Sequence, residues 1–271
     1  MIILKVDSGG EFYGDEGRYY QFAKNLTSGF YSPPAPKIDL TNGPGYPIVL
    51  IPFIAFDLPN ISLKLMNAFF YYLSIILLYK SLQQFASSRK VLIFSLFWAC
   101  YYNLYQDLSL LLTESFTCLL ISLIIFTLLK AFKPDPSKVS NISVFLCGFT
   151  LGYLVLTKII FGYVLIFLLL GSALIWLMKR GIESYKKVVF ILFIAFATTV
   201  PYLIYTYNMT GKILYWGSSG GDSLYWMSTP YEGEYGNWYG EFDIKLTSKQ
   251  ITNSIPGYLD TLKLHHQKNY D

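Results

Sequence analysis

Long apolar segments separated by short polar connections dominate this sequence between residues 47 and 207. A helix of about 20 predominantly apolar residues is long enough to cross the hydrocarbon core of a bilayer. By this criterion we expect about six membrane-spanning helices. They fall near 62–79, 91–106, 111–129, 142–157, 159–178 and 188–207. The apolar run 48–56 is too short to span, and we predict an interfacial or re-entrant helix there.

The amino-acid composition supports a membrane protein. Hydrophobic residues make up 54% of the chain and charged residues only 14%, which is too apolar for an ordinary soluble domain. The formal net charge of +4 requires no nucleic-acid partner, because the basic residues gather in a few connections. We therefore predict an all-α, polytopic helical membrane protein whose extracytoplasmic loops carry short juxtamembrane helices.

Basic residues occur in every second connection between the predicted spans. They are Lys80, Arg89 and Lys90, then Lys130, Lys133 and Lys138, then Lys179, Arg180, Lys186 and Lys187. The alternate short connections carry no basic residue apart from Lys158. Since Lys and Arg accumulate in cytoplasmic loops, this alternation predicts that Lys158 lies on the extracytoplasmic side.

The same topology divides the chain into three predicted parts. Residues 1–46 form a first extracytoplasmic loop with an amphipathic helix, residues 47–207 form the transmembrane domain, and residues 208–271 form an extracytoplasmic loop or tail. We expect a multi-pass protein located in a bacterial inner or plasma membrane. Its functional site would then face the extracytoplasmic side.

Asp15, Glu16 and Arg18 stand at the start of the amphipathic helix, which we expect to run over 16–28 and to stop at Gly29. Asp15 is placed where an N-cap is expected, and Glu16 would favour the helix dipole. Alternatively, a carboxylate held at the membrane surface could act as a general base. Arg18 could be a solvated helix charge or could hold an anionic group.

Three further charged residues belong to the same predicted face. Asp107 and Glu114 are seven residues apart, so they would share a face if one helix contained both. A carboxyl group at the edge of the membrane needs a charged partner or remains protonated. Alternatively, its side chain could extend to the polar interface. Lys158 has no neutralising neighbour in its own connection. It is either an anchor at the headgroup level or a clamp for a phosphate near the lipid surface.

The sequence resembles the GT-C class of membrane glycosyltransferases. The likeness is to the group of protein O-mannosyltransferases and bacterial aminoarabinose transferases, similar to glycosyltransferase family 39. It rests on YGDEGRYYQFAKNLTSG, NGPGYPIVLIPF, LLLTESFTCLLISL, GFTLGYLVLTKIIFGYVLI and the loop sequence PYLIYTYNMTGKILYWGSSGGDSLYW. In relatives, further spans precede the first outer loop and follow the last one, so the chain looks truncated at both ends.

This resemblance implies an enzyme that transfers a sugar, with inversion, from a polyprenyl-phosphate donor in the membrane to an acceptor hydroxyl. Asp15 would be the general base. Substrate binding would involve Glu16, Arg18, Asp107, Glu114 and Lys158, with Lys158 offsetting charge on the leaving phosphate. The acceptor could be a glycan, a lipid or a protein. The arrangement requires no cofactor, although carboxylates are ligands that a divalent metal can use.

Two other functions compete with this interpretation. A catalytically inactive fragment or assembly subunit of a cell-envelope glycosylation system would account for the missing flanking spans. A transporter or flippase component would be expected to place ionisable residues near the bilayer midplane. The predicted spans are mostly free of charges, and the charged residues gather at one end instead.

Overall fold

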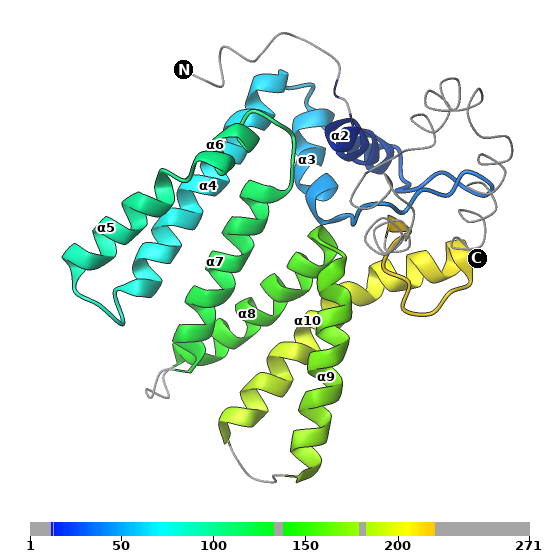
Figure 1. The fold of residues 1–271 in the computed structure, drawn as a ribbon. Coiled ribbons are helices and arrows are strands. Elements are labelled where there is room, and N and C mark those ends of the chain that lie inside the picture. The colour runs from blue at the N-terminus through cyan, green and yellow to red at the C-terminus, as the bar shows by residue number, and fades with distance from the viewer. Residues whose placement is uncertain (1–11, 13, 133–137, 179–182, 220–271) are drawn as a thin grey trace, which may run out of the picture. The chain divides into compact units, whose positions relative to one another are not determined.

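The computed structural model describes residues 12, 14–132, 138–178 and 183–219 (Figure 1). The helices are α2 (Gly14–Thr27), α3 (Gly45–Ala55), α4 (Asn60–Leu82), α5 (Ser88–Ala99), α6 (Tyr102–Asp107), α7 (Glu114–Ala131), α8 (Lys138–Thr157), α9 (Ile160–Met178) and α10 (Glu183–Thr210). No strand occurs in these described ranges, which confirms the all-α class. The chain divides into two compact units, 1–216 and 217–271, and every helix named here belongs to the first. Most of the predicted tail, 220–271, lies outside the described residues.

The lengths of the helices confirm an integral membrane protein. Within the described residues, three helical stretches are long and apolar enough to cross a bilayer. They are Asn60–Leu82, Glu114–Ala131 and Tyr185–Thr210. Shorter apolar stretches in helices are Gly45–Ala55, Asn141–Thr157 and Ile160–Ile175. The first of these, in α3, is the short helix that we predicted over 48–56.

The predicted spans 91–106 and 111–129 differ from the observed helices. The first is divided between α5 and α6, and α7 begins only at Glu114, so residues 108–113 are irregular. Side chains from other helices form hydrogen bonds with the backbone of this segment. The Leu111 N–H donates to Glu16 Oε1 at 2.6 Å, and Asn67 Nδ2 donates to the Leu110 carbonyl at 2.8 Å. Because these partners replace helical hydrogen bonds, the chain can leave the helix here.

Helix α2 begins two residues earlier than the sequence indicates. It starts at Gly14, so Asp15 lies in the first turn and the prediction of an N-cap role is wrong. A carboxylate in the first turn still interacts favourably with the helix dipole. The predicted stop is confirmed, because the helix ends at Thr27 and Gly29 has a φ of +90°.

Among the long helices, α7 packs against both α4 and α8, and α8 packs against α10 (Figure 1). Small residues bring α8 and α10 close together. A Cβ atom added at Gly148 would lie 2.7 Å from the Ile191 carbonyl oxygen, and one at Gly152 would lie 2.5 Å from that of Ala195. Such close backbone contact is how small residues support helix association in membranes, where lipid is as apolar as the side chains.

One apolar core joins the short helices α2 and α3 to the ends of the long ones. Its buried members include Tyr19 from α2, Tyr46 from α3, Leu63 from α4, Phe116 from α7 and Leu154 from α8. The start of α7 and the end of α8 are therefore held beside α2 and α3. The charged residues at the start of α2, at the start of α7 and just after α8 are thereby brought to the same end of the helices.

Candidate active site

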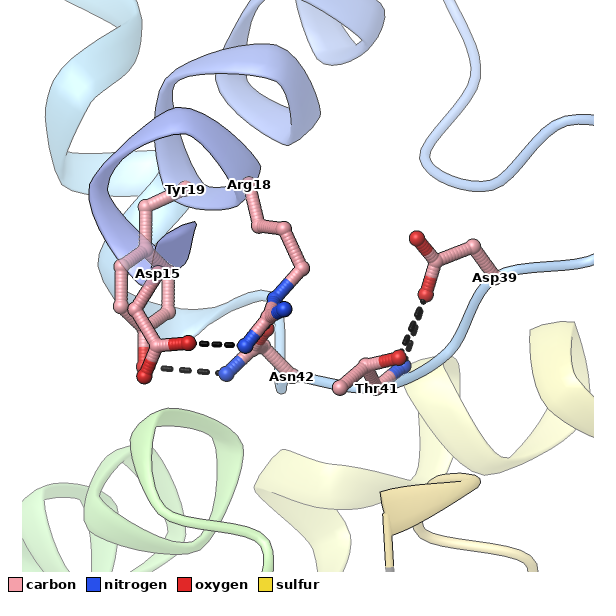
Figure 2. A network of polar contacts seen from close by, with 6 residues as sticks. All are labelled: Asp15, Arg18, Tyr19, Asp39, Thr41 and Asn42. Atoms are coloured by element: carbon pink, nitrogen blue, oxygen red, sulfur yellow. Dashed lines mark hydrogen bonds and ion pairs between the residues drawn. The ribbon is translucent and has the colours of Figure 1, made fainter. Parts of the chain in front are cut away.

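The first turn of α2 presents an ion pair to the connection between α2 and α3. Arg18 Nη2 pairs with Asp15 Oδ1, one helical turn earlier. The Arg18 Nε group also donates to Asn42 Oδ1 at 3.2 Å. Figure 2 shows the arginine reaching from the helix between these two partners. The guanidinium is therefore held on two sides, and the orientation of the Asp15 carboxylate is held with it.

Tyr19 lies beside this pair and connects it with α7. Asn42 Nδ2 donates to the Tyr19 hydroxyl at 3.1 Å (Figure 2). Burial raises the pKa of Tyr19 to about 12, and the nearby carboxylates of Asp15 and Glu114 act in the same direction. The phenol therefore keeps its proton at neutral pH. Its oxygen accepts a hydrogen bond from Asn42, and its hydroxyl lies beside that of Thr113, the residue just before α7.

The segment that carries Asn42 is fixed against the end of α8. A Cβ atom at Gly43 would lie 2.1 Å from the Leu156 carbonyl oxygen, so only glycine allows this approach. Tyr153 donates its hydroxyl proton to the Gly45 carbonyl at 2.8 Å. These contacts join the α2–α3 connection to the residues immediately before Lys158.

Lys158 follows the last residue of α8, where its ammonium group meets the first residue of α7. The Lys158 Nζ atom donates to Glu114 Oε1 at 3.0 Å. The two side chains are 33% and 39% exposed, so the pair is open to the surroundings. This partner could not be predicted from the sequence, because Glu114 is 44 residues away.

Asp107 and Glu114 come from different helices, since α6 ends at Asp107 and α7 starts at Glu114. The condition on which we based their shared face, one continuous helix, is therefore not met. They remain electrostatic neighbours. Burial raises the pKa of Asp107, the charge of Glu114 raises it further, and Lys158 partly opposes both effects. Asp107 is thus close enough to Glu114 and Lys158 for their charges to affect its pKa, although the irregular segment 108–113 separates it from α7 in sequence.

Glu16 has a different position from Asp15. One of its carboxylate oxygens accepts the N–H of Leu111, which is fully buried. This contact joins α2 to the segment just before α7 and so helps to set where Glu114 begins its helix. Its carboxylate is therefore engaged by the backbone of the segment before α7.

We call the assembled group the polar cluster. It consists of Asp15, Arg18, Tyr19, Asn42, Asp107, Glu114 and Lys158. Our sequence reasoning missed Tyr19 and Asn42, because neither carries a charge that would draw attention to it. Among the described residues, no three Asp, Glu, His or Cys side chains gather as metal ligands.

Comparison with known structures reveals the same helical arrangement in a membrane enzyme. The chain superposes on the GT-C aminoarabinose transferase ArnT from Cupriavidus metallidurans bound to undecaprenyl phosphate, with a TM-score of 0.60 and 16% identity. The match covers 83% of this chain. The apo structure of the same protein gives a TM-score of 0.59 over 77% of the chain, again at 16% identity. The chain has a GT-C-like fold.

This chain covers 43% of the length of the lipid-bound ArnT structure and 40% of the apo structure. No protein-family model and no curated protein sequence matches it. The likeness therefore concerns the fold. It agrees with the class that the sequence motifs indicated.

Proposed function

We propose that the protein takes part in glycosyl transfer, moving a sugar from a polyprenyl-phosphate donor to an acceptor hydroxyl on the extracytoplasmic side of a bacterial inner membrane. The polar cluster is the observation that carries this proposal. It combines two carboxylate–cation pairs, Asp15–Arg18 and Glu114–Lys158, at one end of the membrane helices. The ArnT fold supports the proposal, because one of its structures is bound to undecaprenyl phosphate.

Lys158 is proposed to bind the phosphate of the donor. Its partly exposed pair with Glu114 resembles surface ion pairs, which contribute roughly 0.2–1 kcal/mol. A phosphate offers more charge and more acceptor oxygens than one carboxylate oxygen, so it can displace Glu114 at small cost. Lys158 would then stabilise the negative charge that develops on the leaving phosphate. Arg18 is proposed as a second cation for the same group.

Asp15 is proposed to be the general base. The acceptor oxygen attacks the anomeric carbon while the bond from that carbon to the phosphate oxygen breaks. The bonding electron pair leaves with the phosphate, and the acceptor proton moves to the Asp15 carboxylate. The pairing of Asp15 with Arg18, which Asn42 holds from the other side, supports this role because a base must be oriented toward the proton it takes.

The proposed side of the membrane follows from the distribution of basic residues. The polar cluster lies at the helix ends opposite to those that carry Lys80, Lys130 and Lys187, which adjoin the basic connections of the sequence. Since such connections are usually cytoplasmic, the cluster would face the opposite side. That is where polyprenyl-linked sugars would meet acceptors of the cell envelope.

The test is donor turnover by the full chain in liposomes. The donors are undecaprenyl phosphate carrying glucose, mannose or aminoarabinose, an envelope extract supplies acceptors, and released undecaprenyl phosphate is measured. We expect turnover of at least one donor, and a loss of at least a hundredfold in Asp15→Asn, the lower range of general-base contributions. Asp57→Asn, a change to an exposed carboxylate after α3, is the matched control. Full activity of Asp15→Asn would exclude Asp15 as the base, and absence of turnover with every donor would contradict the proposal.

A further inference from the structure

The start of α7 carries an unusual group of buried polar atoms. Four buried side-chain oxygens in the described residues have no hydrogen-bond partner: Ser95 Oγ, Thr113 Oγ1, Glu114 Oε2 and Thr117 Oγ1. The last three lie within five consecutive residues. A buried oxygen without a partner is unfavourable, because it has lost its hydrogen bonds to water and gained none in the protein. Three such oxygens at one place indicate that something else supplies their hydrogen bonds.

The geometry brings these atoms to the polar cluster. Thr113 immediately precedes α7 and is only 1% exposed, and Thr117 lies one helical turn beyond it on the same face. Glu114 stands between them, with its other oxygen paired to Lys158. The Thr113 hydroxyl also lies beside that of Tyr19 and offsets part of the rise that burial causes in the Tyr19 pKa, but the distance and angles between the two groups do not meet those of a hydrogen bond.

The chemistry of these atoms selects a class of ligand. A carboxylate oxygen accepts hydrogen bonds, and a threonine hydroxyl both donates and accepts. This combination complements a ring that carries several hydroxyl groups. A phosphate alone would be a poor match, because it would bring further negative charge to the carboxylate of Glu114.

We propose that Thr113, Glu114 and Thr117 form a subsite that binds the hydroxyl groups of the sugar ring of the donor. This inference rests on the proposed function, since the phosphate of the same donor would bind at Lys158. Arrival of the phosphate frees Glu114 from Lys158, and the carboxylate can then accept from the sugar hydroxyls. The subsite distinguishes a sugar-bearing lipid from the bare lipid phosphate.

Binding of defined lipids to the full chain in detergent, measured by native mass spectrometry, tests the subsite. The ligands are undecaprenyl phosphate alone and undecaprenyl phosphate carrying glucose, mannose or aminoarabinose. The wild type should bind at least one sugar-bearing lipid more tightly than the bare lipid. Thr117→Val keeps the shape of the side chain and should reduce this preference by about two- to tenfold, the value of one neutral hydrogen bond. Affinity for the bare lipid should not change.

Three further variants separate this role from a structural one. Thr117→Ser should retain the preference. Glu114→Gln should lose preference while binding the bare lipid at least as tightly, because Lys158 is released. Ser95→Ala, at the other unpartnered oxygen, should leave the preference unchanged. The melting temperature of Thr117→Val should not fall, since the hydroxyl it loses bonds to no protein group.

The outcomes distinguish this subsite from the proposed function. If the wild type binds the bare and sugar-bearing lipids equally, or if Thr117→Val keeps the full preference, the subsite is excluded while lipid-phosphate binding stands. A lower melting temperature of Thr117→Val would show that its hydroxyl has a protein partner and would also exclude the subsite. Absence of binding to every lipid would overturn both.

Discussion

Replacement of Glu16 by alanine tests whether this carboxylate fixes the start of α7. Glu16 Oε1 accepts the N–H of Leu111 at 2.6 Å across 95 residues of sequence. Leu111 is fully buried, and the irregular segment 108–113 has no helical hydrogen bond to offer in its place. Glu16→Ala leaves this N–H without its acceptor.

The structure sets the magnitude of the effect. A hydrogen bond to a charged group contributes about 1.5–3 kcal/mol. We take this range as the loss expected when the buried Leu111 N–H is left without its acceptor. A change of 1 kcal/mol shifts the melting temperature by about 2–4 °C for chains of 150–250 residues. We therefore expect Glu16→Ala to lower the melting temperature by about 3–12 °C. Glu16→Gln keeps an oxygen that can accept the N–H, so its effect should be less than half as large.

Thermal unfolding in detergent and amide exchange measure these effects together. Exchange of the Leu111 amide, followed by mass spectrometry of peptides that span 108–113, should become at least tenfold faster in Glu16→Ala, because 1.4 kcal/mol corresponds to a factor of ten. Peptides from α9 should exchange as in the wild type, since no Glu16 contact reaches that helix. Asp57→Asn controls for the loss of a negative charge.

Unchanged exchange over 108–113 in Glu16→Ala would refute this reasoning. It would mean that the carboxylate contact contributes nothing to the order of the segment. Equal loss of stability in Glu16→Gln and Glu16→Ala would also contradict it, because the amide oxygen of glutamine should still accept the Leu111 N–H.

Three other changes have defined expectations. Tyr46→Phe leaves the fully buried Asn67 Oδ1 without its donor at 2.8 Å and should cost about 1–3 kcal/mol in chemical unfolding, and unchanged stability would contradict this. Gly43→Ala forces a Cβ against the Leu156 carbonyl, so we expect a loss of at least about 1–3 kcal/mol and weaker binding of undecaprenyl phosphate, and unchanged values would contradict the packing. Asp107 has a higher pKa in the folded protein than its ordinary pKa of 3.8. Its contribution to stability therefore falls as the pH rises from 3.8 through the pKa of the folded state. Asp107→Asn should therefore melt higher than the wild type at pH 7, and this gain should disappear below pH 3.8.

The positions of the helices could largely be predicted from the sequence. The lengths of the apolar runs and the turn-forming residues between them are local signals, and α4, α8, α9 and α10 lie close to where those signals placed them. The irregular segment 108–113 could not be predicted in this way. This segment is held by hydrogen bonds with the side chains of Glu16 and Asn67, which are far away in the sequence.

The charged residues of the polar cluster were predicted, but their partners were not. Sidedness places Lys158 and Glu114 near one membrane surface, and only the packing of α7 against α8 pairs them. Asn42 carries no charge and follows a threonine in a turn, so its contacts with Arg18 and Tyr19 depend on a fold that sequence reasoning does not supply.

The central claim, that Asp15 serves glycosyl transfer, is tested most directly in cells. Envelope glycans are compared by mass spectrometry in a strain that lacks the gene and carries a plasmid with the wild type, Asp15→Asn or Asp57→Asn. Our account predicts that deletion removes one glycan modification, and that the wild type and Asp57→Asn restore it while Asp15→Asn, present at equal level, does not. Restoration by Asp15→Asn, or an unchanged glycan profile after deletion, would contradict the account.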